Sequence, residues 1–156
     1  MKPLPVLAAL AAVALTAQAH AAPPSHADAV ALRLLSVDAD RAWNAADADA
    51  MAAHYAPDAS LLVGAAGGRT SRGRDEIRAY FARAFGTRAG VMRHVSELKG
   101  MEALSPDLVL NDLEVRVEER QADGTWKLVR RFDNLSLAVR AEGGWKLRAV
   151  RAYPAD

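Results

Sequence analysis

Hydrophobic residues in the first half of the chain are spaced for three helices. Between about residues 26 and 46 they recur every three or four positions, which places them on one face of an amphipathic helix. A second, shorter helix is predicted after Asp47, whose side chain can cap a helix N-terminus, with Tyr55 on its inner side. A third helix is predicted over residues 74–85, and Gly86 is expected to end it as a C-terminal glycine cap.

After Gly90 the spacing changes to alternation, which is typical of strands separated by turns. The predicted strands cover residues 91–103, 108–119, 126–141 and 145–153, and a shorter one covers residues 59–63. This order predicts an α+β fold, in which three N-terminal helices pack on one face of a curved, mostly antiparallel sheet. Helices cannot cover the whole concave face of such a sheet, so a pocket is expected between the two layers.

Polar residues that share a face with the alternating hydrophobic ones are candidates for the lining of this pocket. By parity they are Asn111 beside Val109 and Leu113, Arg131 and Asp133 beside Val129 and Leu135, and Arg151 beside Trp145 and Leu147. Charges on an inner face are costly unless they are paired or solvated. Two interpretations are open. In the first, Arg131 or Arg151 binds an anionic group of a ligand and Asp133 orients that group. In the second, these charges form an internal Arg–Asp pair or lie at strand ends that reach solvent.

The glycine-rich segment 64–73 lies between a predicted strand and a predicted helix, as phosphate-binding loops do. No Gly-Lys-Ser/Thr sequence follows its glycines, and the dinucleotide fingerprint G-x-G-x-x-G is missing too. We interpret the segment as a turn, so no nucleotide or other cofactor is expected. Asp75 and Glu76 would instead meet the positive N-terminal end of the helix that follows.

The N-terminal residues have the pattern of a cleaved secretory signal. Lys2 is followed by an apolar run and then by small residues, which offer two cleavage sites, after Ala19 and after Ala21. The alternative, an uncleaved membrane anchor, is disfavoured because the apolar run is short for a bilayer. We therefore expect residues 1–21 to be a signal peptide and residues 22–156 to form one periplasmic or secreted domain, without a stable membrane anchor.

Composition narrows the possible partners. The 156-residue chain has a net charge of +1, and loss of Lys2 with the signal brings the mature chain to zero. A neutral protein has no overall field that attracts nucleic acid, so no nucleic-acid partner is expected. The chain contains no cysteine, so its fold must be held by its core without disulfides.

Three segments of the chain resemble a known family. The runs AWNAADADAMAAHYAPDASLL and GRDEIRAYFARAF resemble the opening of SnoaL-like domains, and GGWKLRAVRAY resembles the last strand of these domains. The matching positions in the opening are Trp43, Asn44, Asp47, Tyr55, Asp58, Ala59, Gly73, Arg74 and Ile77. SnoaL-like domains belong to the nuclear transport factor 2-like superfamily of cone-shaped α+β barrels, so the resemblance implies this fold over nearly the whole mature chain. It also implies a homodimer formed through the outer face of the sheet.

The same opening helices resemble those of the ketosteroid isomerases. The resemblance would place the oxyanion tyrosine of those enzymes at Ala39, and their general-base aspartate at about Leu62 or Val63. These residues can neither donate a hydrogen bond to an enolate nor accept a proton, so that isomerase chemistry is not expected.

The other candidates lie on the helices and on the first long strand. His94 could carry a proton if an acid lies beside it, although a lone strand histidine is more often structural. Trp43 and Tyr80 lie on apolar helix stripes and are expected to pack in the core, while the resemblance implies that Trp43 borders the pocket. No two histidines stand at metal-ligand spacing, so no metal site is expected.

Three functions remain open at this point. The first is binding of a small, partly apolar molecule, with or without an anionic group, in the cavity of an exported domain. The second is an isomerase, dehydratase or cyclase that transfers protons with Asp133 or His94, and the third is a protein-interaction module. The candidate ligand-binding residues are Trp43, Tyr80, His94, Asn111, Arg131, Asp133 and Arg151.

Overall fold

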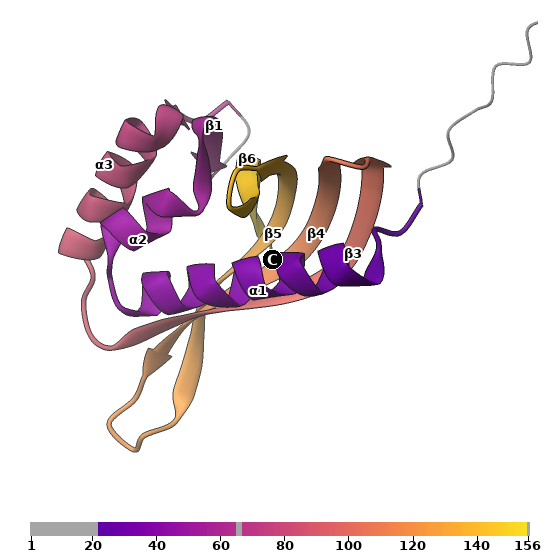
Figure 1. Cartoon of the computed structure of the whole chain (residues 1–156). Helices are drawn as coiled ribbons and strands as arrows, with labels where there is room; N and C mark the ends of the chain where they lie inside the picture. Colours follow the sequence, from indigo (N-terminus) through magenta and orange to yellow (C-terminus); the bar gives the residue numbers. More distant parts are fainter. Residues whose placement is uncertain (1–21, 65–66, 156) are drawn as a thin grey trace, which may run out of the picture.

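The computed structural model describes residues 22–64 and 67–155, which form helices and a single sheet (Figure 1). The predicted signal at residues 1–21 lies outside the described residues. The helices are α1 (His26–Asn44), α2 (Ala48–Ala53) and α3 (Gly73–Gly86). The strands are β1 (Tyr55–Val63), β2 (Thr70–Arg72), β3 (Met92–Ser105), β4 (Leu108–Arg120), β5 (Trp126–Ala141) and β6 (Gly144–Ala155).

The six strands lie in the order β2-β1-β6-β5-β4-β3. All neighbouring pairs are antiparallel except β1 and β6, which run parallel. In Figure 1, α1 runs across the curved strands, and α2 and α3 gather beside β1. The predicted α+β fold, with helices on a curved and mostly antiparallel sheet, is confirmed.

Side chains at the helix starts define where the helices begin. Ser25 Oγ accepts from the backbone N–H of Asp28 at 3.2 Å, and Asp47 Oδ1 accepts from Ala50 at 2.9 Å. Glu76 Oε2 accepts from the backbone N–H of Arg72 at 2.9 Å, just before α3. The cap predicted at Asp47 is therefore confirmed, and Asp75 and Glu76 lie in the first turn of α3 as predicted.

Several predicted boundaries are wrong. Tyr55 is the first residue of β1 and does not lie on α2, because its neighbour His54 accepts a backbone hydrogen bond from Leu147 at 2.9 Å, next to the pairing of β1 with β6. The glycine-rich segment contains β2, which pairs with β1. Gly86 is the last residue of α3 and not a left-handed cap; the hydroxyl of Thr87 donates to the last carbonyls instead.

The side-chain parity predicted for β5 and β6 is also wrong. On β5 the large residues Leu135 and Leu137 lie on the outer face, and smaller residues such as Ser136 and Ala138 face the helices. On β6 the register slips by one residue at Arg148, because Leu137 pairs with Ala149 whereas Ala138 pairs with Leu147. A one-residue bulge moves every later side chain to the opposite face.

The core of the described residues is divided into separate packed clusters. One cluster joins α2, α3 and β1 to β6, and it includes Ile77, Phe81 and Val150. A second cluster joins α1 to the middle of the sheet through Leu32, Val109 and Trp145.

None of the described helices combines the length and the hydrophobicity that a membrane span requires.

Strand β3 lies at an edge of the sheet, and part of its free backbone is satisfied by α1. His94 N–H donates to Asn44 Oδ1 at 2.6 Å, and Asn44 Nδ2 donates to His94 O at 3.3 Å. One turn earlier on α1, Asp40 Oδ2 accepts from the backbone N–H of Ser96 at 2.8 Å. At the other end of the strand, the N–H of Ala103 donates to the carbonyl of Ala22 at 2.8 Å.

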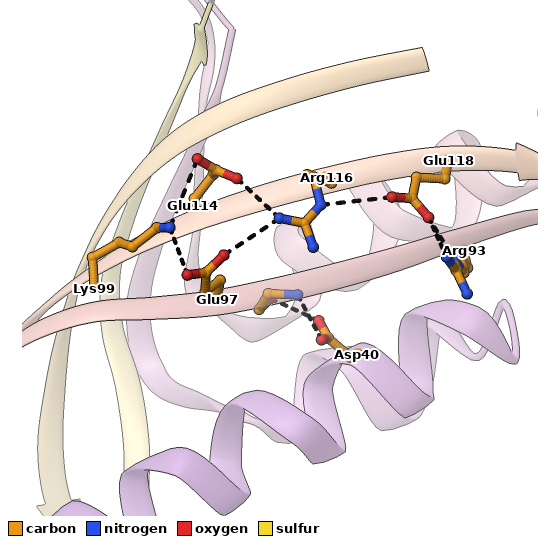
Figure 2. Close-up of polar contacts among 8 residues, drawn as sticks. Asp40, Arg93, Glu97, Lys99, Glu114, Arg116 and Glu118 are labelled. Atoms are coloured by element: carbon orange, nitrogen blue, oxygen red, sulfur yellow. Dashed lines mark hydrogen bonds and ion pairs between the residues drawn. The ribbon is translucent and has the colours of Figure 1, made fainter. Parts of the chain in front are cut away.

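Ion pairs run along the outer face of β3 and β4 (Figure 2). The three acids and three bases alternate in space, with the closest contacts at 2.6 to 3.1 Å for three of the pairs: Arg93–Glu118, Lys99–Glu97 and Arg116–Glu114. We call these six residues the outer ion-pair ladder. Because most of its members are partly exposed, each pair contributes little to stability by itself.

Candidate functional site

A cavity of about 400 Å³ lies between the helices and the inner face of β3, β4, β5 and β6. Most of its wall is apolar, with Leu35, Met51, Leu61, Phe81, Val115 and Phe132 among the lining residues. This volume is in the range of sites that hold small organic molecules.

Two arginines lie at the mouth of the cavity. The exposed residues Ala84, Thr87 and Arg130 line it and mark where it opens to solvent. Arg88 is half-buried there, and its guanidinium carbon lies 3.7 Å from the centre of the Trp43 ring. Arg88 Nη2 also donates to Trp43 O at 3.1 Å, and burial lowers the pKa of its guanidinium. Within the described residues, no ion pair is recorded for Arg88 or Arg130.

A histidine and an aspartate form a hydrogen-bonded pair on the cavity wall. His94 comes from β3 and lines the cavity, and its Nδ1 lies 2.6 Å from Asp40 Oδ1. Asp40 is also held by Ser96, whose hydroxyl donates to Oδ1 at 2.7 Å. The ring of His94 packs against Trp43 with centroids 5.1 Å apart. Figure 2 shows Asp40 reaching from α1 toward β3.

Two tyrosines add hydroxyl groups to this apolar space. Tyr55 and Tyr80 both line the cavity. Burial raises the pKa of Tyr55 and that of Tyr80 above the ordinary value of a phenol. Both hydroxyls therefore remain protonated at neutral pH and can act as hydrogen-bond donors.

Further polar groups come from the middle of the sheet. Asn111 Nδ2 donates to Ser136 Oγ at 3.4 Å, and Ser136 lines the cavity together with Asn134. Within the described residues, the Oδ1 atoms of Asn111 and Asn134 are buried without a hydrogen-bond partner. A buried acceptor without a partner is costly, so a donor from water or from a ligand would stabilise Asn134.

The structure brings together some of the predicted site residues. Trp43, Tyr80 and His94 line the cavity, and Asn111 is buried behind it on the inner face of β4. Their roles toward a ligand stay predictions.

The inner placement predicted for Arg131, Asp133 and Arg151 is wrong. Arg131 and Asp133 belong to the outer parity of β5, and Asp133 lines a separate depression on the outer face. Arg151 lies beyond the bulge of β6 and donates to Ser60 O at 3.3 Å.

Sequence reasoning missed Asp40, Arg88 and Arg130. Asp40 lies one turn from Asn44 and Ser36, so a polar stripe along α1 was the available signal. For Arg130 the signal was its alternation with Phe132 on the opposite parity of β5. Arg88 follows the end of α3, and no periodic pattern places such a residue.

The positions that match the ketosteroid isomerases carry no polar side chain. Ala39 and Val63 both line the cavity. They offer neither a proton acceptor nor a donor to an oxyanion, as the sequence predicted. Any proton transfer in this cavity must use other residues.

A model of the SnoaL-like domain family matches residues 38–150. The chain belongs to the SnoaL-like family. No curated protein sequence matches this SnoaL-like domain. Its family membership confirms the resemblance found in the opening helices and the last strand.

Solved structures share the fold of this SnoaL-like domain. Aln2 from a Streptomyces species is similar with a TM-score of 0.76 and 19% identity, over 85% of this chain and 94% of that one. A domain of unknown function with a cystatin-like fold from Nostoc punctiforme has a TM-score of 0.72 and 22% identity, over 85% and 80% of the two chains. A ketosteroid isomerase-like protein from Erwinia carotovora atroseptica has a TM-score of 0.64 and 21% identity, over 81% and 95%. At these identities the likeness shows the fold alone.

Proposed function

We propose that this SnoaL-like domain binds a small, largely apolar molecule with an anionic group in its cavity. The observation that carries the proposal is the combination of an apolar cavity of about 400 Å³ with two arginines at its mouth. Apolar walls favour the body of such a ligand, and a few polar groups fix its orientation.

The charge at the mouth supports an anionic group on the ligand. Arg88 rests on Trp43 and bonds only to a neutral carbonyl among the described residues, so its positive charge has no recorded counter-ion there. Arg130 lines the same opening. A guanidinium can donate two parallel hydrogen bonds to a carboxylate or sulfonate, which makes arginine well suited to such groups.

A pair of fluorescent probes tests the proposal. 1-Anilinonaphthalene-8-sulfonate has an apolar body and an anionic group, whereas N-phenyl-1-naphthylamine has the same rings without the sulfonate. We expect one molecule of the sulfonate to bind per chain, more tightly than the neutral probe. Ala84→Trp, which narrows the mouth from an exposed position, should weaken both probes.

The arginine variants separate charge from cavity. Arg88→Met should weaken the sulfonate about tenfold, because a charge-assisted hydrogen bond contributes about 1.5 kcal/mol. The neutral probe should be unaffected. Arg83→Met is the matched control, since Arg83 is an exposed arginine of α3 that does not line the cavity. The proposal would be contradicted if neither probe binds, or if the wild type and Ala84→Trp bind the probes equally well.

We further propose that the domain acts after export to the periplasm or the cell exterior. The leader pattern from Lys2 to Ala21 supports this placement. The intact mass of the protein recovered from the periplasm is expected to equal that of residues 22–156. A mass that still includes residues 1–21 would contradict cleavage there.

We also propose a homodimer formed through the outer face of the sheet. Leu135 is 42% exposed on that face, beside the outer ion-pair ladder with its equal numbers of acids and bases. A balanced, mixed surface can pair with a second copy of itself. Leu135→Glu should convert a dimer to a monomer in sedimentation experiments, and a wild type that is monomeric at about 100 μM, where a dimer of moderate affinity would form, would refute the proposal.

A further inference from the structure

The Asp40–His94 pair has the arrangement of a general base held by a carboxylate. Asp40 accepts from Ser96 through both its oxygens, so its carboxylate is fixed in place before it meets His94 Nδ1 at 2.6 Å. Asn44 holds the backbone of His94 through two further hydrogen bonds. Both the ring and its partner are therefore fixed by contacts that do not depend on a ligand.

These contacts define the protonation pattern of the neutral imidazole. An ionised carboxylate accepts hydrogen bonds only, so Nδ1 carries the proton and donates to Asp40. Nε2 then holds the free lone pair, and no hydrogen bond to it is recorded within the described residues. Since His94 lines the cavity, this nitrogen is available to a bound molecule.

The surroundings suit the charges that a proton transfer creates. When Nε2 takes a proton, the imidazolium that forms is stabilised by Asp40 at hydrogen-bond distance. Arg88 packs against the same Trp43 ring as His94, so a positive charge lies near the base for the negative charge that develops on the substrate. The apolar wall strengthens both interactions by lowering the local dielectric constant.

We propose that His94 is the catalytic base of a proton-transfer reaction in this cavity, with Asp40 as its positioning residue. The substrate class is a carbon acid, a small molecule with a C–H bond next to a carbonyl or comparable electron-withdrawing group. Nε2 takes the proton, the C–H electron pair forms a C=C bond, and the carbonyl π pair moves to the oxygen to give an enolate. Where the substrate also carries a C=C bond conjugated with the enolate, the imidazolium returns the proton to the far carbon of that bond, so the net reaction is an isomerisation without a co-reactant. This proposal rests on the proposed binding of a small molecule in the same cavity.

5-Nitrobenzisoxazole is a suitable probe because it is small, apolar and planar. A base removes its ring C–H proton, the electron pair forms a nitrile, and the N–O bond breaks to release a coloured phenolate. The reaction needs one base and no co-reactant, so it reports on general-base catalysis without knowledge of the natural substrate. We expect the wild-type domain to convert it with saturable kinetics above the buffer rate.

The variants assign the base and its partner. His94→Gln should lower kcat about 100-fold or more with little change in KM, as expected for loss of a general base. Asp40→Asn should lower kcat about tenfold, also at nearly constant KM, because the imidazolium loses its counter-charge. His54→Gln is the matched control, since His54 is a half-buried histidine that does not line the cavity, and it should keep the wild-type rate.

A second measurement needs no variant and guards against misfolding. In spectra of the wild type with ¹⁵N-labelled histidine, at a pH where imidazole is neutral, His94 should be the Nδ1–H tautomer. The Nε2–H tautomer would overturn the assignment, as would a folded His94→Gln that retains half of the wild-type kcat. An unchanged kcat in Asp40→Asn would overturn the role of Asp40.

The outcome for the wild type distinguishes this proposal from the one it rests on. If the naphthalene sulfonate binds but 5-nitrobenzisoxazole is not converted, the catalytic assignment is overturned and cavity binding stands. If neither the sulfonate nor 5-nitrobenzisoxazole interacts with the folded domain, both proposals fail.

Discussion

The attachment of α1 to the edge strand β3 can be tested by truncating Asn44. Asn44→Ala removes two hydrogen bonds, one from His94 N–H at 2.6 Å and one to His94 O at 3.3 Å. A typical intramolecular hydrogen bond contributes about 1 kcal/mol net. Because Asn44 is exposed, water can reach the freed backbone groups, so the cost should lie at about 1 to 2 kcal/mol.

The loss in the free energy of unfolding is measurable by urea or thermal denaturation followed through tryptophan fluorescence. For a domain of this size, 1 to 2 kcal/mol corresponds to a fall in Tm of about 3 to 8 °C. The amide of His94 should also exchange its hydrogen faster, whereas exchange of the amides in the middle of the sheet should change only with global stability.

Two further variants sharpen the test. Arg41→Ala is the matched control on α1, because it removes an exposed ion pair with Asp38 and should cost under about 0.5 kcal/mol. Asn44→Asp keeps the acceptor for His94 N–H but faces His94 O with a second acceptor, so it should fall between wild type and Asn44→Ala. The reasoning is refuted if Asn44→Ala costs no more than Arg41→Ala and the exchange of the His94 amide is unchanged.

Three further predictions concern stability. Ile77→Ala should cost about 2 to 5 kcal/mol in urea denaturation, because Ile77 is fully buried on the inner side of α3, and a cost below about 1 kcal/mol would contradict its core position. The pKa of Asp28 is lowered mainly by the hydroxyl of Ser25 and also by Arg140 and Trp145. The carboxylate therefore adds to the free energy of unfolding above its ordinary pKa of 3.8, and this contribution is lost as pH falls through the folded pKa. Asp28→Asn should make the free energy of unfolding less dependent on pH in this acidic range. Gly73→Ala should cost about 1 to 2 kcal/mol in thermal melts, because Gly73 has a φ of +76° at the start of α3, and an unchanged Tm would disprove that strain.

Periodicity was sufficient for the three helices, the five longer strands and their layers, because hydrophobic spacing and turn residues act locally, but it did not show the three-residue strand β2. The match of Asn44 to the family motif also has a physical explanation, because its side-chain amide hydrogen-bonds the backbone of the edge strand β3. The polar lining of the cavity needed information that is not local. Asp40 and His94 are 54 residues apart, and only the closed fold brings them together.

The errors on β5 and β6 have two different physical causes. On β6 the bulge at Arg148 changes the parity part-way along the strand, so the face that holds Trp145 and Leu147 does not continue to Arg151. On β5 Val129, Leu135 and Leu137 face outward. The assumption that these hydrophobic residues mark the inner face therefore selected Arg131 and Asp133 in place of Arg130 and Asn134.

The parallel pairing of β1 with β6 has a consequence for the order in which the chain folds. Leu61 on β1 pairs with Val150 on β6, and both belong to the core cluster beneath α3. This cluster cannot pack completely until the last strand has been synthesised. The helices of the first half therefore lack part of their core until the C-terminal strand is present. Contacts between such distant segments make folding slow. A chain that completes its core last stays unfolded while it is being made, which is the state that the proposed export across a membrane requires.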